Sequence, residues 1–249
     1  MNTKILKVFG LLIIGLFLIN ACGLSTIQDS REEITGSGNV ITESREVSGF
    51  DSVSHTGIGR VIITQGDMES LTIEADDNLL EHITSEVKNG TLELGFNENV
   101  RFESTSSITF TVGAKDIVEL GSTGTGLIEI DDLGTENLRI LKTGTGSISI
   151  GTLTANDLMV NADGTGDIEL AGTVANQELD LKGTGDYDAP DLESQTASVG
   201  VTGTGSVVLW VLDSLDVEIV GISKVNYYGN PNVTQSITGT GGLTSLGDK

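Results

Sequence analysis

The sequence holds few of the residues on which disulfide-bonded folds, nucleic-acid binding and aromatic-rich cores depend. Among its 249 residues there is one cysteine, so no disulfide can form within the chain. Lysine and arginine together number 13 against 36 acidic residues, which gives a net charge of -23. A surface this short of positive charge repels phosphate backbones, which excludes nucleic acid as a partner. Aromatic residues make up 4% and prolines number 2, a composition that suits a tightly wound all-β chain.

Recognisable catalytic motifs are missing as well. The two histidines, His55 and His82, do not stand in a metal-ligand spacing. The chain contains no Gly-x-Ser-x-Gly, His-Glu-x-x-His or phosphate-binding loop. Pairs of carboxylates cleave sugars in glycosidases, but in a chain this rich in acids a pair arises by chance. We therefore predict no catalytic residues and no enzymatic activity, with a carbohydrate-active β-helix enzyme as the weaker alternative.

What the sequence does contain is a short phrase, Gly-Thr-Gly, at a nearly constant interval. Its first glycine recurs after 20, 20, 19 and 20 residues, and a last copy follows after 36. The copies begin at Gly124, Gly144, Gly164, Gly183, Gly203 and Gly239. A fixed period near 20, without a helical pattern, is typical of one coil of a parallel β-helix. We predict an all-β, single-stranded, right-handed parallel β-helix (a solenoid) with about 20 residues per rung.

Each phrase leads into alternating apolar residues, and this alternation assigns its glycines and threonine to opposite faces. In the first copy, Gly124 and Gly126 share the parity of the apolar residues that follow and face inward, whereas Thr125 faces outward. Glycine suits such a corner because it lets neighbouring backbones approach closely. The β-helix domain is predicted to span residues 36–249, with room for about ten rungs.

Residues 76–88 depart from the repeat. Asp76-Asp77-Asn78 is predicted to cap a short helical turn. Asn89-Gly90 separates two apolar runs and is typical of a turn between strands.

The first residues have the layout of an export signal. Lys4 and Lys7 precede an apolar run over residues 8–19, which is too short for a comfortable membrane span. The segment ends in Leu-Ile-Asn-Ala-Cys at residues 18–22, which resembles the bacterial lipoprotein box. We predict a lipoprotein signal peptide over 1–21, lipidation of Cys22, a polar tether over 22–35 and lipid anchoring to the membrane. An ordinary signal peptide with an incidental cysteine is the alternative.

The predicted lipidation of Cys22 also indicates where the protein resides. Several acyl chains hold a protein stably on a membrane, whereas a single chain does not. Gly23 follows the cysteine, and in the familiar sorting pattern a residue other than Asp favours the outer membrane. We therefore expect an exported protein, lipid-anchored to the cell envelope at the outer membrane.

Several phrases of the sequence together resemble one bacterial family. They are a Gly-x-Gly opening at 36–38, Asp-Asp-Asn-Leu-Leu at 76–80, Lys-Asn-Gly-Thr-Leu at 88–92, the Gly-Thr-Gly ladder, and Val-Asn-Tyr-Tyr-Gly-Asn-Pro at 225–231. In this order they resemble the putative auto-transporter adhesin, head GIN domain family over about residues 40–245. The resemblance implies an extracytoplasmic β-helix, often lipid-anchored, and brings no catalytic residues with it.

Four acidic residues are predicted to share one outward surface of two neighbouring rungs. They are Asp167, Glu169, Asp186 and Asp188. Carboxylates on such a narrow grid repel one another unless a cation lies among them, and calcium takes oxygen ligands in loose geometry. A calcium site is one interpretation and a solvated acidic face is the other, because the glycine-rich nonapeptide of calcium β-rolls is absent. No other cofactor is indicated.

The scarce aromatic residues gather late in the chain as Trp210, Tyr227 and Tyr228. They form a candidate contact patch for a glycan or a surface protein. The alternative interpretation is that they provide cover for a long loop or for the C-terminal edge of the solenoid.

Repetition without a catalytic centre favours a presented surface. We therefore predict a cell-envelope lipoprotein that uses its β-helical surface for binding or adhesion to glycan or to a surface protein. The alternative is a structural or regulatory envelope protein that acts as a spacer.

Overall fold

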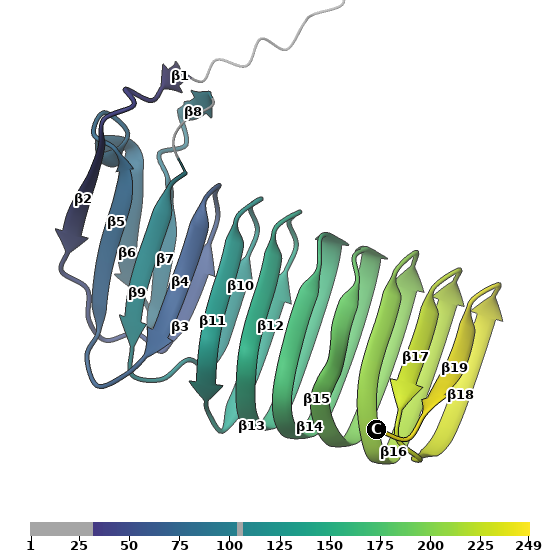
Figure 1. Cartoon of the computed structure of the whole chain (residues 1–249). Coiled ribbons are helices and arrows are strands. Elements are labelled where there is room, and N and C mark those ends of the chain that lie inside the picture. The colour runs from purple at the N-terminus through teal and green to yellow at the C-terminus, as the bar shows by residue number, and fades with distance from the viewer. Residues whose placement is uncertain (1–31, 104–106) are drawn as a thin grey trace, which may run out of the picture. The chain divides into compact units, whose positions relative to one another are not determined.

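The computed structural model describes residues 32–103 and 107–249, which fall within one compact unit, Arg31–Lys249. In this unit the chain winds into stacked parallel coils (Figure 1), a β-solenoid of about 6 turns with about 20 residues per turn. Strands account for 72% of the structure. The all-β parallel β-helix predicted from the Gly-Thr-Gly period is therefore confirmed.

Each coil contributes one stretch of strand to each of two facing sheets. The first sheet runs β2 (Val40–Arg45), β5 (Ser70–Asp76), β9 (Thr109–Ala114), β4 (Arg60–Gln65), β11 (Leu127–Gly134), the first parts of β13 (Ser147–Thr165), β14 (Ile168–Thr184), β15 (Tyr187–Gly203) and β16 (Ser206–Gly221), then β17 (Lys224–Tyr228) and β19 (Gly242–Gly247). The second runs β6 (Ile83–Lys88), β7 (Thr91–Phe96), β3 (Ser52–His55), β10 (Glu119–Ser122), β12 (Asn137–Lys142), the second parts of β13 to β16, and β18 (Asn232–Gly239).

The core lies between these two sheets and consists of inward-facing columns in register. One column on the first sheet reads Ile128, Ile148, Ile168, Tyr187, Val207 and Val225, each paired with the next coil and each nearly free of solvent exposure. The alternating residues of the same strands face outward, as the period-2 pattern requires. Stacking like residues at each level is what lets a repeating sequence fill a continuous core.

The Gly-Thr-Gly corners stack backbone directly on backbone. The carbonyl oxygen of Gly124 accepts hydrogen bonds from Thr145 N (3.0 Å) and Gly146 N (3.1 Å) in the next coil. A Cβ built on Gly144 would lie 2.0 Å from this same oxygen. The threonine of every copy is exposed. The outward threonines are thus confirmed. A side chain at Gly144 would meet the backbone of the preceding coil and not the core, so glycine is required because that backbone occupies the place of a side chain.

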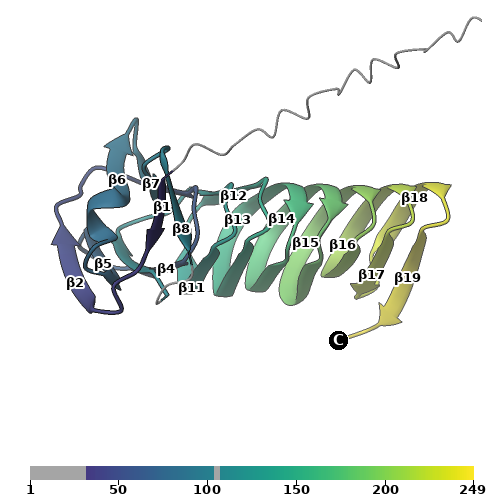
Figure 2. The same ribbon diagram turned by 90° about the horizontal axis from the view of Figure 1, so that it is seen from above.

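The N-terminal part does not form regular coils, so the predicted ten rungs are reduced to about 6 turns. Here β5 pairs antiparallel with β2 and β9, and β6 pairs antiparallel with β7. Viewed from above, these strands gather at one end of the coil stack (Figure 2). A further parallel pair joins β1 (Glu32–Thr35) to β8 (Val100–Glu103). Antiparallel hairpins need only short turns, so this region carries no 20-residue period for the sequence to reveal.

The predicted turn between β6 and β7 is present. Asn89 (φ 52) and Gly90 (φ 83) both have positive φ, as a two-residue type I′ hairpin turn requires. The predicted helical turn is a short 3-10 helix, η1 (Leu80–His82), but it has no side-chain cap. Instead, Asp77 accepts hydrogen bonds from Ser37 Oγ (2.5 Å) and Asn39 Nδ2 (2.8 Å). The polar run thus holds the N-terminal loop and does not cap the helix.

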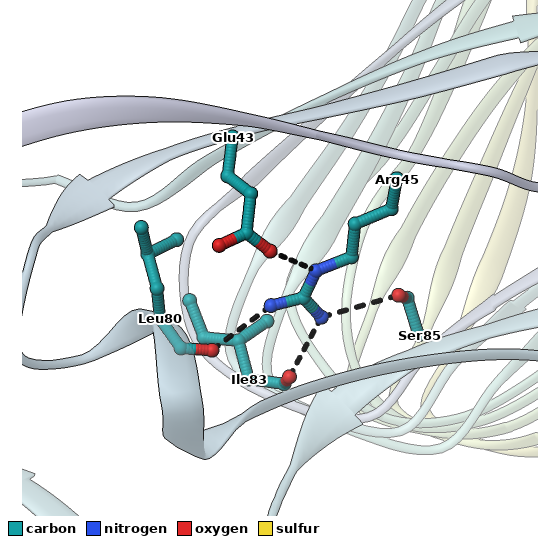
Figure 3. A network of polar contacts seen from close by, with 5 residues as sticks. All are labelled: Glu43, Arg45, Leu80, Ile83 and Ser85. Carbon is teal, nitrogen blue, oxygen red and sulfur yellow. Dashed lines mark hydrogen bonds and ion pairs between the residues drawn. The ribbon is translucent and has the colours of Figure 1, made fainter.

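Arg45 at the end of β2 ties this N-terminal edge to η1 and β6 (Figure 3). Its guanidinium donates to the carbonyl oxygens of Leu80 (2.9 Å) and Ile83 (2.7 Å) and to Ser85 Oγ (3.2 Å). Glu43 accepts a further bond from Arg45 Nε at 2.7 Å. One planar side chain therefore connects β2 to two consecutive segments that lie 35 to 40 residues later in the sequence, which a lysine cannot reproduce.

Replacing Arg45 with methionine is expected to lower the free energy of unfolding by about 2 kcal/mol, since two carbonyl oxygens lose a charged donor. Urea denaturation followed by circular dichroism measures this change. Arg139→Met is the matched control, because Arg139 is exposed on β12 and its side chain makes no hydrogen bond within the described residues. Equal losses in both variants would show that the network does not stabilise the N-terminal edge.

The N-terminal predictions fall largely outside the described residues. These are the signal peptide over 1–21, the lipidated Cys22 and the first part of the tether. Residues 32–35, the end of the predicted tether, form strand β1. Within the described parts of the chain, no helix has the length and apolar character needed to cross a membrane.

Candidate functional site

The four predicted acidic residues do lie together on the outer surface of the first sheet. Glu169 pairs with Asp188 on the neighbouring coil. Asp167 and Asp186 lie two residues earlier on the same two coils, at the preceding outward position. All four are exposed and border a depression of about 270 Å³, with Ser206 and Val208 on the next coil. The repeat spacing therefore placed these side chains on one surface, as expected.

Two of these carboxylates already bind the backbone. Asp167 Oδ1 accepts a hydrogen bond from Asp186 N (3.1 Å), and Asp186 Oδ1 accepts one from Ser206 N (2.8 Å). Each side chain thus supports the strand of the coil that follows. In the described residues no three or more acidic, histidine or cysteine side chains converge as a metal-binding group. Calcium binding by the four carboxylates stays a prediction.

The structure brings together two of the three predicted aromatic residues. Trp210 and Tyr228 are paired on neighbouring coils and are half-buried. The Nζ of Lys249 lies 5.3 Å from the ring centre of Trp210 and 5.1 Å from that of Tyr228, a cation–π arrangement. The same ammonium pairs with Asp191. Tyr227 instead packs against the core, because it is one residue out of phase with Tyr228. The ring faces are therefore occupied by the chain's own lysine.

A larger hollow, which was not predicted from the sequence, lies on the outer surface of the second sheet. Two rows of outward side chains line it, one residue per coil in each row, in register across β13, β14, β15, β16 and β18. The first row consists of Asp157, Asn176, Thr196, Ser214 and Asn232. The second row consists of Met159, Glu178, Ser198, Asp216 and Thr234. We call this hollow, of about 690 Å³, the two-row groove.

Hydrogen bonds between coils fix the side chains of the first row. Asn176 Nδ2 donates to Asp157 Oδ1 (2.8 Å), and Thr196 Oγ1 donates to Asn176 Oδ1 (2.8 Å). The row therefore presents amide and hydroxyl groups at the coil spacing of about 4.8 Å. The signal for it was in the sequence, since its members follow one another after 19, 20, 18 and 18 residues. They differ in chemical type, however, so no repeated letter marks the row.

Two buried basic side chains inside the solenoid were not predicted from the sequence. Lys142 is 1% exposed and its Nζ donates to Thr165 O (3.1 Å) beside a cavity of about 20 Å³, room for one water molecule. Burial lowers the pKa of Lys142. His55 is fully buried with its ring edge toward Phe110, and burial lowers its pKa to about 4. Both groups are shielded from solutes, so we assign them to the core.

Comparison with known proteins shows that the chain is similar to bacterial proteins described as putative adhesins. A model of the family "Putative auto-transporter adhesin, head GIN domain" matches residues 49–231. A crystal structure of a putative adhesin from Bacteroides fragilis is 27% identical, with a TM-score of 0.83, and the match covers 86% of this chain and 100% of that one. A comparison with curated proteins found no significant match.

Two more distant solved structures share the fold. A putative lipid binding protein from Parabacteroides distasonis is 23% identical, with a TM-score of 0.74 over 86% of this chain and 100% of that one. A putative adhesin from Parabacteroides merdae is 18% identical, with a TM-score of 0.68 over 86% and 99%. At these identities the likeness concerns the fold alone.

Proposed function

Since the chain belongs to the putative auto-transporter adhesin, head GIN domain family, we propose that it is a non-catalytic binding module of the cell envelope and that the two-row groove binds glycan. The proposal includes export, lipidation at Cys22 and anchoring to the outer membrane, with the solenoid held outside the lipid. Adhesin-like relatives support a surface or extracellular place for the protein.

The observation that carries the proposal is the regular spacing of polar groups in the two-row groove. Its volume of about 690 Å³ is in the range of small-molecule sites. The first row offers amide and hydroxyl groups that pair with sugar hydroxyls, and Asn176 is held in place by both neighbours. The coil spacing of about 4.8 Å is close to the length of one sugar ring in an extended chain.

The negative charge of the groove and of the whole chain limits which glycans can bind. Three of the ten outward side chains in the two rows are carboxylates, namely Asp157, Glu178 and Asp216. The chain as a whole carries a net charge of -23. Anionic polysaccharides are therefore repelled, and we propose neutral or amino-bearing glycans as the ligands.

A glycan array with the chain from residue 23 onward tests the proposal. This chain keeps β1 and every core residue, since the buried apolar residues lie between Phe50 and Val225. Saturable binding to neutral or amino-bearing glycans is expected. Ser198→Arg, which fills the middle of the groove, is expected to weaken binding at least about tenfold, or about 1.4 kcal/mol. Ser198 is exposed, so the variant keeps the fold.

Two further variants locate the site if it lies elsewhere. Trp210→Ala removes the aromatic patch and Asp186→Asn alters the acidic cluster, and both residues belong to the opposite sheet. We expect neither to change affinity for glycan. If either variant lost glycan binding while Ser198→Arg kept it, the two-row groove would not be the glycan-binding site. Running the array with calcium and with chelator shows whether calcium contributes. The absence of any binding would favour the spacer role.

A further inference from the structure

The coil stack ends at its C-terminal side in two unpaired strand edges. Among the described strands, β18 pairs only with β16, and β19 pairs only with β17. The backbone groups on the far edges of β18 and β19 therefore face solvent. Such an edge is a ready template for pairing with another strand. In Figure 1 the two strands form the last coil of the stack.

The last coil also exposes side chains that belong to the core. Ile237 pairs with Ile219 and Val233 pairs with Leu215, so both continue inward-facing columns. Ile219 and Leu215 are 0% and 1% exposed, whereas Ile237 and Val233 are each 39% exposed. The difference arises because, among the described residues, no further coil covers them. The end of the solenoid is therefore an open section through the hydrophobic core.

The two strands at this end, β18 and β19, carry no charged side chain, although the chain as a whole is strongly acidic and Lys224, Asp248 and Lys249 flank them in sequence. Residues 225–247 contain no Asp, Glu, Lys or Arg, in a sequence with 36 acidic and 13 basic residues. The N-terminal edge strands differ, since β2 carries Glu43 and Arg45, and β6 carries Glu86 and Lys88. Charged side chains on an edge strand are a common protection against pairing. The C-terminal end lacks this protection.

We propose that the C-terminal end is a self-association surface, on which a second copy of this chain docks end to end about a two-fold axis. The axis lies perpendicular to the solenoid, so each edge of the last coil meets an antiparallel edge of the partner. Unpaired N–H and C=O groups then bond across the interface, and Ile237 and Val233 of both copies become covered. The sheets continue from one copy into the other.

The lack of charge on β18 and β19 suits this end to contact with a second copy of the chain. Two chains that each carry a charge of -23 repel one another, and the repulsion between facing groups is least where neither side holds a charge. A two-fold arrangement uses the same patch on both copies and closes at two. Head-to-tail growth would instead place this neutral edge against the charged strands β2 and β6, which the edge does not complement.

Sedimentation velocity of the chain from residue 23 onward, over a concentration series at physiological salt, tests the proposal. A monomer–dimer equilibrium is expected. Ile237→Glu places a carboxylate on the end and is expected to raise the dimer dissociation constant at least about tenfold, since like charges then face each other. Ile41→Glu is the matched control, because Ile41 is 42% exposed on the edge strand β2 at the other end.

Amide hydrogen exchange shows which strands form the dimer interface. Amides of β18 and β19 are expected to exchange more slowly as the concentration rises, while those of β2 stay unchanged. A purely monomeric protein overturns the proposal. A dimer that Ile237→Glu leaves intact, with the variant's melting temperature unchanged, places the interface elsewhere and also overturns it. Growth beyond the dimer into filaments refutes the two-fold arrangement.

Discussion

Gly144→Ala is expected to destabilise the solenoid by about 3 kcal/mol or more, enough to prevent folding in a protein of ordinary stability. The added Cβ would lie 2.0 Å from Gly124 O and 2.8 Å from the backbone of Thr123. The oxygen it meets is also the acceptor for Thr145 N and Gly146 N. Relief by moving the coils apart therefore breaks hydrogen bonds that hold them together. Thermal or urea unfolding measures the loss.

Gly66→Ala is the control for the effect of the methyl group alone. A Cβ at Gly66 meets nothing within 4 Å, and its backbone is outside the left-handed region. Replacing glycine by alanine at such a position stabilises the protein by less than about 1 kcal/mol, because it reduces the conformational entropy of the unfolded chain. If Gly144→Ala were as stable as Gly66→Ala, the close backbone contact at the corners would not be a determinant of the fold.

The buried His55 is expected to make stability fall with acidification by about 3 kcal/mol. In the unfolded chain its imidazole binds a proton below pH 6.5, whereas in the folded state burial lowers the pKa to about 4. Between these values only the unfolded state gains a proton, so the equilibrium shifts toward unfolding. The contribution is absent above pH 6.5 and levels off below about 4. At about 1.4 kcal/mol per pH unit, this window gives the stated magnitude.

Carboxylates titrate in part of the same range, so the measurement compares variants. His55→Leu removes the ionisable ring while filling its place beside Phe110. Urea denaturation at about pH 7 and about pH 4.5 is expected to show a smaller loss of stability in this variant than in the parent, by about 2–3 kcal/mol. His82→Gln, at a partly exposed site, is the control and should behave as the parent does. Equal pH dependence in His55→Leu and the parent would contradict the assignment.

The regular part of the fold was predictable because one local requirement repeats. Every coil needs glycine where backbones stack, so the corner phrase at Gly144 and its copies gave the period, the parity and the inward columns. The N-terminal part has no such requirement. Its antiparallel strands are joined by turns, of which Asn89-Gly90 alone is a strong signal. The pairing of β5 with β2 and β9 depends on contacts distant in sequence, which no period reports.

The candidate site was predictable only where one residue type recurs. Asp167 and Asp186 were found because the same letter stands at the same place in two coils. The first row of the two-row groove was missed because Asn176, Thr196 and Ser214 differ in letter while sharing a function as polar groups. The three aromatic residues do not all lie together, since a one-residue difference in parity sends Tyr227 toward the core and Tyr228 outward.

Because two distinct ends enclose a repeating middle, the length of this protein can change by whole coils. A coil such as residues 143–162 contacts only the coils beside it, so an in-frame duplication would lengthen the stack by one strand spacing, about 4.8 Å, without altering either end. Each added coil would also extend both rows of the groove by one side chain. Recombination between copies of one short segment would then change two properties together: the length of the solenoid and the number of side chains that can contact a ligand.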